Sequence, residues 1–198
     1  MAGKLIVLEG IDGCGKTTQF KLLTDRLTAQ GREYRRLRFP RYENPSSTLV
    51  RMYLGGKFGT DPECVNAYAA STFYAVDRYA SYLEDWGEYY RAGGLVLTDR
   101  YTTSNAVHQA AKMAPGERAD FFRWLFHFEY ELLELPRPDR VLLLDMEPAA
   151  AAELRRRRCG AEDIHEADES YLAACRETAL EAAAFDCWTV IEIGRAHV

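Results

Sequence analysis

The chain has 198 residues, of which 47% are hydrophobic and 28% are charged, a composition typical of one soluble globular domain with a sizeable core. Its formal net charge of −5 argues against a broad basic face for nucleic acid and favours small phosphorylated ligands as partners of local arginine clusters. No apolar run approaches the roughly 20 residues that a membrane-spanning helix needs, so we expect no membrane association.

Five cysteines are scattered along the chain, at positions 14, 64, 159, 175 and 187, and none forms a closely spaced pair. An odd and scattered set argues against a disulfide framework and against a zinc site. The first apolar run stops at Glu9 without a cleavage region after it, so the N-terminus does not predict a signal peptide. We therefore expect reduced thiols and a cytoplasmic protein.

A glycine-rich segment joins the first predicted strand, over 5–8, to the first predicted helix, over 17–30. This segment, Gly10-Ile11-Asp12-Gly13-Cys14-Gly15-Lys16-Thr17, has the pattern G-x-x-x-x-G-K-[ST]. The order of buried strand, glycine loop and helix is the context in which this pattern forms a phosphate-binding loop. The sequence therefore predicts that the chain binds ATP or GTP. The alternative is a glycine-rich turn that binds no ligand.

The residue types in this loop suit a polyphosphate. The glycines allow the backbone to turn tightly and to aim N–H groups inward, where the positive end of the following helix adds to them. Lys16 is expected to reach the β- and γ-phosphates, and the Thr17 hydroxyl is expected to bind Mg²⁺. The predicted nucleotide-binding residues are Gly10, Gly13, Cys14, Gly15, Lys16, Thr17 and Thr18.

Beyond the loop, short apolar runs alternate with helical patterns, which favours an α/β fold with a five-stranded parallel sheet and helices on both faces. Ligands of such sheets bind at the carboxyl ends of the strands. The helix over 60–83 is predicted to begin with Thr60 as N-cap, Pro62 in the first turn and Glu63 in a capping box. The other predicted strands cover 33–39, 95–98, 141–144 and 188–191. The other predicted helices cover 47–54, 84–91, 104–112, 117–133, 148–158 and 170–184.

A second polar cluster, Asp99-Arg100-Tyr101, follows the predicted strand over 95–98. In a parallel sheet this position lies near the glycine loop, if the two strands are neighbours. Asp99 can then orient a metal-bound water, and the planar guanidinium of Arg100 can bind a second phosphate group. The alternative is a structural ion pair at the end of a strand.

Together these segments resemble the thymidylate kinases, a family of P-loop nucleoside monophosphate kinases. The resemblance covers Lys4 to Ile191 and implies a single kinase domain over 1–191, in the P-loop NTPase fold, that transfers the γ-phosphoryl group of ATP to dTMP. The products would be dTDP and ADP, in dTTP synthesis, with Mg²⁺ as cofactor and a homodimer as the assembly. Besides the loop, the resemblance rests on Phe39-Pro40, Tyr74-Ala-Val-Asp-Arg78, Asp99-Arg100-Tyr101-Thr-Thr-Ser104-Asn105, Gln109, Leu135-Pro-Arg-Pro-Asp139 and an arginine run before Asp163 and Glu166.

The resemblance also implies where dTMP binds. Arg100 would clamp the acceptor phosphate, Tyr74 would stack on thymine, and Arg78 would donate to a base carbonyl from the same helix face. Core packing is the alternative for Tyr74. Position 108 often carries a tyrosine near the sugar in relatives, and we expect His108 to be a solvated helix histidine instead. The implied substrate-binding residues are Arg41 (with Arg51 as alternative), Tyr74, Arg78, Arg100, Ser104, Asn105 and Gln109.

For the chemical step, the resemblance implies that Asp12, Lys16 and Asp99 are catalytic and that Thr17 and Asp99 serve the metal. It also implies a cationic lid around 155–168. Within that lid, Arg155 and Arg158 share a helix face, so both are predicted catalytic cations, with Arg157 as an alternative.

Two other functions stay open at this stage. A kinase of the same fold can act on another nucleotide or on a nucleoside. The chain can also be a non-catalytic, nucleotide-dependent switch, although the guanine-reading tetrad N-K-x-D of such GTPases does not occur in the sequence. Finally, Glu192–Val198 corresponds to the translation of a common sequencing adapter, so we expect residues 192–198 to be a non-native tail in place of the relatives' closing helix.

Overall fold

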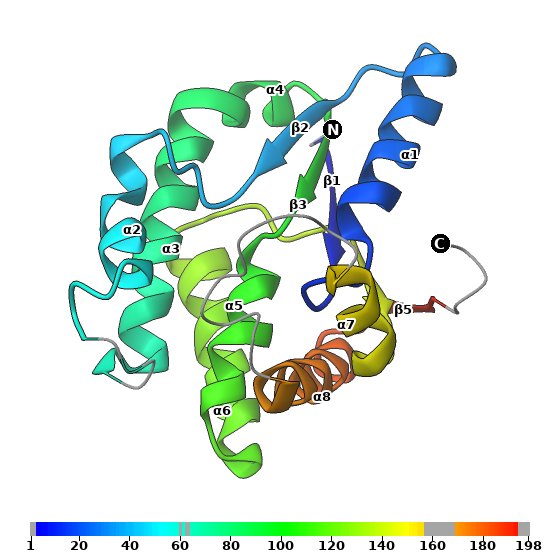
Figure 1. Cartoon of the computed structure of the whole chain (residues 1–198). Coiled ribbons are helices and arrows are strands. Elements are labelled where there is room, and N and C mark those ends of the chain that lie inside the picture. The colour runs from blue at the N-terminus through cyan, green and yellow to red at the C-terminus, as the bar shows by residue number, and fades with distance from the viewer. Residues whose placement is uncertain (1–2, 60, 62–63, 157–168, 194–198) are drawn as a thin grey trace.

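The computed structural model describes residues 3–59, 61, 64–156 and 169–193, and it confirms the predicted α/β fold. Five parallel strands form one sheet in the order β2-β3-β1-β4-β5 (Figure 1). The central strands are almost fully buried, because helices cover both faces, and this explains their uninterrupted apolar runs. The strands are β1 (Lys4–Glu9), β2 (Arg35–Arg38), β3 (Leu95–Asp99), β4 (Arg140–Asp145) and β5 (Thr189–Glu192).

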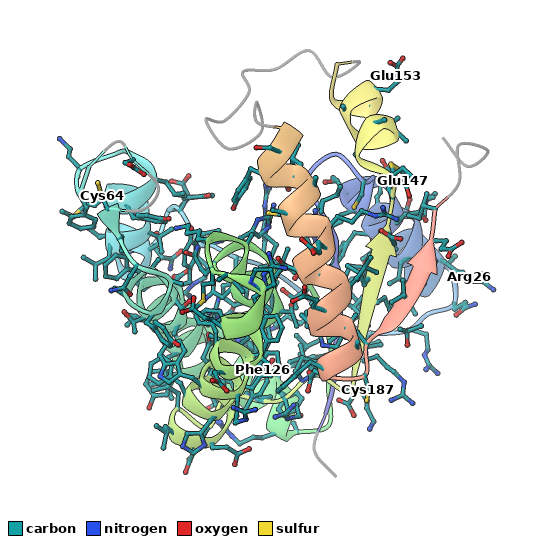
Figure 2. All side chains as sticks on the ribbon, turned by 90° about the horizontal axis from the view of Figure 1, so that it is seen from below. Arg26, Cys64, Phe126, Glu147, Glu153 and Cys187 are labelled. Carbon is teal, nitrogen blue, oxygen red and sulfur yellow. The ribbon has the colours of Figure 1, made fainter. Side chains whose placement is uncertain are left out.

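Helices pack on both faces of this sheet. Helix α1 (Lys16–Ala29) lies against β1 and β3 on one face, whereas α8 (Glu169–Phe185) lies against β4 and β5 on the other and packs along α5 (Thr102–His108) (Figures 1 and 2). Among the described residues, none of the helices is both long and apolar enough to span a bilayer. The other helical segments are η1 (Pro45–Ser47), α2 (Thr48–Leu54), α3 (Ala67–Ser81), η3 (Tyr82–Trp86), α4 (Gly87–Arg91), η4 (Ala110–Lys112), α6 (Pro115–Phe126), η5 (His127–Leu132) and α7 (Pro148–Arg156).

Helix α3 begins at Ala67, and its predicted start at residue 60 is wrong. The Asn66 side chain accepts a hydrogen bond from the Ala69 N–H at 2.9 Å, which makes Asn66 the N-cap. Residues 64–66 lie outside the helix, so the local capping signal upstream of them does not begin it. The residues that carried that signal, Thr60, Pro62 and Glu63, lie outside the described residues.

Two π-helical turns continue α3 and α6. The turn η3 joins α3 to α4 without a break, and η5 continues α6 to Leu132. Such turns insert an extra residue into the helix and shift the direction of the side chains that follow, and they occur often at functional sites. Here η5 carries Glu129 to the buried side of α3.

Glu129 and Arg78 form a buried ion pair that connects three elements. Arg78 Nε and Nη2 donate to the two Glu129 oxygens at 2.7 and 2.5 Å, and the side chains are 2% and 0% exposed. Thr102 Oγ1 donates to the same carboxylate at 2.7 Å, and Arg78 Nη1 donates to the Tyr101 carbonyl at 3.4 Å. The pair therefore fastens α3, η5 and the start of α5 at the end of β3.

Replacing Glu129 with Gln is expected to lower the free energy of unfolding strongly. The substitution keeps the side-chain volume but leaves the Arg78 cation buried without a counter-charge, a change that costs about 3–5 kcal/mol. The matched control is Arg123→Ala, which removes the exposed pair of Arg123 and Asp120, whose side chains are 67% and 76% exposed. Such surface pairs contribute about 1 kcal/mol or less. Equal losses for the two variants in urea unfolding would contradict a stabilising role for the buried pair.

Candidate active site

A cavity of about 340 Å³ opens at the carboxyl ends of the strands, where the sequence placed the ligands. The glycine loop after β1, the ends of β2 and β3, and residues of α2, α3, α5, η4 and α8 line it. The register of the sheet explains this meeting point: β1 and β3 are parallel neighbours with Leu8 opposite Asp99. The two chain segments therefore leave the sheet side by side.

The glycine loop has the backbone that its pattern requires. Gly10, Gly13 and Gly15 have φ values of 151°, 89° and 84°, which L-residues with side chains rarely adopt. A Cβ atom on Gly10 would lie 2.6 Å from Cys14 Sγ and 2.8 Å from the Leu144 carbonyl oxygen. Gly10 and Cys14 thus support the loop from behind, whereas Gly13 and Gly15 line the cavity.

Lys16 is nearly buried and folds over this loop. Its Nζ atom donates to the carbonyl oxygens of Gly10 and Ile11 at 2.6 and 2.9 Å, and it lies 3.5 Å from Asp12 Oδ1. Lys16, Asp12 and Thr17 all line the cavity, as predicted for a polyphosphate site. Thr18 is exposed and does not belong to the cavity wall.

Arg100 and Asp12 connect the turn after β3 to the glycine loop. Arg100 Nη2 donates to Asp12 Oδ1, and Arg100 Nη1 lies 2.9 Å from His108 Nε2. Burial opposes ionisation of Asp12, but Arg100 and Lys16 together hold the pKa of this carboxyl well below its ordinary value of 3.8. Burial likewise opposes the charge of Arg100, and Asp12 reverses the effect and raises the pKa of the guanidinium. Asp12 is therefore an anion that two cations share.

Glu9, at the end of β1, supports the site through buried contacts that the sequence did not predict. Its side chain is fully buried. One oxygen accepts the Gly10 N–H at 3.1 Å, and the other accepts the hydroxyl groups of Thr103 and Ser104 at 2.8 and 2.7 Å. This carboxylate ties the loop to the first turn of α5. An acid at the end of a buried strand, directly before the first loop glycine, was the signal that could have indicated it.

The far side of the cavity contains most of the predicted substrate residues. Tyr74, Arg78, Ser104, Asn105 and Gln109 all line it, so Tyr74 does not belong to the closed core. Asn105 Nδ2 donates to the Ser71 carbonyl at 3.2 Å, which fixes the amide. Gln109 is 4% exposed, and its Oε1 has no hydrogen-bond partner among the described residues. A buried acceptor of this kind suits a donor group on a ligand.

Arg41 does not reach the cavity. Its main-chain N–H donates to the buried Asp77 at 2.7 Å, and its guanidinium binds Asp77, Ser46 and Glu84. Asp77, on α3, therefore holds the Arg41 side chain outside the cavity wall. The alternative, Arg51, donates instead to nearby carbonyl and hydroxyl groups of its own segment. From this segment, Arg38 and Tyr42 line the cavity.

His108 is not the solvated helix histidine that we expected. It is half-buried, lines the cavity and contacts Arg100. Tyr171, from the first turn of α8, lies beside it with ring centroids 6.4 Å apart and was not predicted at all. Its partner His108 is 63 residues away in sequence, so no local pattern indicated the contact.

The structure describes only some of the residues that were predicted for the metal site and the lid. Thr17 and Asp99 line one cavity and offer a hydroxyl and a carboxylate, whereas the described residues contain no cluster of three or more His, Cys, Asp or Glu side chains for a metal. Mg²⁺ suits such a site, because it commonly takes few protein ligands and completes its shell with phosphate and water. Arg155 lies in α7. Arg157, Arg158, Asp163 and Glu166 lie outside the described residues.

Comparison with known proteins finds relatives in one family. The sequence model of the family described as thymidylate kinase matches residues 8–196. Thymidylate kinase of Mycobacterium tuberculosis is 34% identical over 155 residues, which are 78% of this chain and 71% of the relative. A probable thymidylate kinase of Staphylothermus marinus is 34% identical over 154 residues, or 78% of this chain and 69% of the relative. The solved structure of thymidylate kinase from Candida albicans, 22% identical, has the same fold, with a TM-score of 0.71 over 98% of this chain and 85% of that one.

Replacing Gly10 with Ala is expected to weaken ATP binding by at least about tenfold, or about 1.4 kcal/mol. The added methyl group would press on Cys14 and Leu144 at a backbone angle unsuited to alanine, so the loop cannot keep its N–H groups aligned. Gly116→Ala is the matched control, because nothing lies within 4 Å of its added Cβ. Calorimetric titration with ATP measures both, and unchanged binding by Gly10→Ala would refute the assigned role of the loop.

Proposed function

Because the chain belongs to the thymidylate kinase family and phosphorylates dTMP, we propose that this cavity transfers the γ-phosphoryl group of ATP to dTMP to give dTDP and ADP. One observation carries the proposal. Asp12 contacts both Lys16 and Arg100, so a cation suited to the donor phosphates and a cation suited to the acceptor phosphate face the same carboxylate. Two phosphate-binding groups in one cavity are what transfer between two nucleotides requires.

The donor side of the proposed reaction uses the glycine loop. Its N–H groups and the N-terminus of α1 attract the ATP phosphates, and Lys16 can exchange its loop carbonyl partners for β- and γ-phosphate oxygens. Thr17 and Asp99 are the residues that would hold Mg²⁺. When bound, this ion would neutralise charge on the phosphates. Asp99 does not need to act as a base, because phosphoryl transfer depends mainly on positioning and charge neutralisation.

The acceptor side uses Arg100 and the residues of α3 and α5. Only two of the five N–H groups of a guanidinium are needed for Asp12 and His108, so Arg100 keeps donors for the dTMP phosphate. Tyr74 supplies an aromatic face for thymine, and burial raises the pKa of its phenol, so the ring stays neutral. The Gln109 oxygen, which has no hydrogen-bond partner among the described residues, suits the N–H of the base.

We propose that the chain is one kinase domain and that a lid around 155–168 supplies the cations near the γ-phosphoryl group. Helix α7 follows β4, whose Leu144 carbonyl lies behind Gly10, so the helix begins close to the loop. Arg155, in α7, and Arg158 are the proposed lid residues. An arginine that meets the developing charge contributes roughly 10³–10⁵ in rate in related transferases.

An acceptor panel tests this function. In a coupled assay of ADP release with ATP and Mg²⁺, we expect dTMP to be turned over better than dUMP, dCMP, dGMP or thymidine. Chelation of Mg²⁺ by EDTA is expected to remove the activity, because the charge of the phosphates is then uncompensated. If another acceptor is turned over better than dTMP, that acceptor is the substrate instead. Tight ATP binding without turnover of any acceptor would instead favour a nucleotide-dependent switch.

We further propose a homodimer through the outer side of α3. Val76, Tyr79 and Leu83 follow one another along α3 and η3 and are 51%, 39% and 61% exposed. Tyr68 extends this apolar surface to α6 by an edge contact with Trp124, with ring centroids 4.7 Å apart. Large apolar side chains gathered on one surface are typical of subunit interfaces.

Val76→Glu is expected to convert the dimer to single chains, because it places a charge in the apolar contact. Leu22→Glu is the control: Leu22 is 56% exposed on α1, which covers the opposite face of the sheet. Analytical ultracentrifugation distinguishes the species. A wild-type protein that sediments as one chain, or a dimer that persists in Val76→Glu, would refute this interface.

Free thiols support a cytoplasmic location. Among the described residues, Cys14, Cys64, Cys175 and Cys187 form no disulfide, and the two exposed ones, Cys64 and Cys187, lie far apart (Figure 2). Reduced cysteines persist where glutathione and thioredoxin act. Cell fractionation tests the assignment, and recovery outside the cytoplasm would contradict it.

A further inference from the structure

We propose that His108 is a positioning residue, which holds the Arg100 guanidinium for the acceptor phosphate and is itself held by α8. The inference rests on the proposed function, because it takes Arg100 as the phosphate ligand of dTMP. Three contacts carry it: Arg100 Nη1 to His108 Nε2 at 2.9 Å, Tyr171 Oη to His108 Nδ1 at 3.4 Å, and Cys175 Sγ to the same Nδ1 at 3.6 Å.

The contact with Arg100 determines the protonation of the imidazole. A guanidinium can only donate hydrogen bonds, so Nε2 of His108 must accept and the single ring proton of the neutral form lies on Nδ1. That proton points toward Tyr171 and Cys175 on α8. Burial raises the pKa of the Cys175 thiol to about 12 and that of the Tyr171 phenol further, so both stay neutral and can accept it.

His108 gives Arg100 a second support, at the terminal nitrogen Nη1, whereas Asp12 binds Nη2. Without it, Asp12 is the one side chain among the described residues to which the flexible Arg100 side chain keeps a hydrogen bond. Asp12 also lies 3.5 Å from Lys16, which serves the donor. The arrangement His108–Arg100–Asp12 therefore fixes the guanidinium between two partners before dTMP arrives, which lowers the cost of ordering it on binding.

Acid should remove this support. An imidazolium has two N–H donors and no acceptor, so it cannot receive the Arg100 hydrogen bond, and its charge opposes that of the guanidinium. Among the described residues, Asp12 is an anion that interacts with His108 electrostatically, but Lys16 and Arg100 already share it. In the part of the chain that the structure describes, the titratable and charged groups that face or neighbour the imidazole include Asp12 from the loop, Arg100 from the end of β3, Tyr171 and Cys175 from α8, and Lys112 from η4 in the same cavity.

Three substitutions test the role of Nε2. Glutamine can place its Oε1 near the position of Nε2, whereas the shorter asparagine reaches only the position of Nδ1, and leucine has no acceptor. We expect His108→Leu and His108→Asn to raise the KM for dTMP by about tenfold, the factor that one lost hydrogen bond to a charged group typically gives, with the KM for ATP unchanged. We expect His108→Gln to restore most of this loss. Equal effects of Gln and Asn would overturn the proposal.

The pH profile provides a second readout. As the pH falls from about 8 to about 5, the range over which histidines in proteins take up a proton, the KM for dTMP of the wild type should rise relative to that of His108→Gln. Titration of the dTMP phosphate affects both enzymes equally, so the ratio of their KM values isolates the imidazole. A ratio that does not change with pH would overturn the proposal.

Arg100→Ala separates this inference from the function on which it rests. If Arg100→Ala leaves the KM for dTMP unchanged, the proposed phosphate contact fails. If Arg100→Ala raises this KM but His108→Leu does not, the phosphate contact stands and the positioning role of His108 is refuted. Unchanged ATP affinity in each His108 variant confirms that the variant is folded, so a KM effect confined to dTMP reports the acceptor side alone.

Discussion

The carboxylate of Asp12 is the interaction on which the rest of the site depends. It lies between Lys16 of the glycine loop and Arg100 of the turn after β3, so it keeps two cations close that would otherwise repel each other. The three side chains together carry one net positive charge toward the space where phosphates bind. Their meeting follows from the parallel pairing of β1 and β3, which brings the two segments out at one edge of the sheet.

Buried carboxylates extend this organisation into the first turn of α5. Thr102 donates to Glu129, which pairs with Arg78 on the acceptor side. The next two residues, Thr103 and Ser104, donate to Glu9, which also accepts the Gly10 N–H of the donor loop. Three consecutive hydroxyl groups thus connect both halves of the cavity to one short helix. Fixed dipoles of this kind favour transfer, because they need little reorganisation when charge develops.

The sequence predicted the glycine loop, the parallel sheet and the place of Asp99 and Arg100, because these depend on short patterns and on one topological rule. It did not predict which of several possible partners a given side chain contacts. Arg41 binds Asp77, 36 residues away, and His108 binds Arg100 across the turn between β3 and α5. Likewise, the capping pattern near Thr60 was a valid local signal, but Asn66 begins the helix. Local signals do not reveal which of several competing partners lies nearer in space.

By itself, therefore, the sequence determined which apolar runs form strands, which loop can bind phosphates and the family to which the chain belongs. Steric limits at glycine and the alternation of apolar residues act over a few neighbours, so they can be read without coordinates. Only the tertiary structure decided that Glu9 is buried against Thr103 and Ser104, and that Tyr171 stands beside His108. The strength of a hydrogen bond depends on distance and angle, and that of an ion pair on distance. For residues far apart in the chain, the fold alone sets these distances.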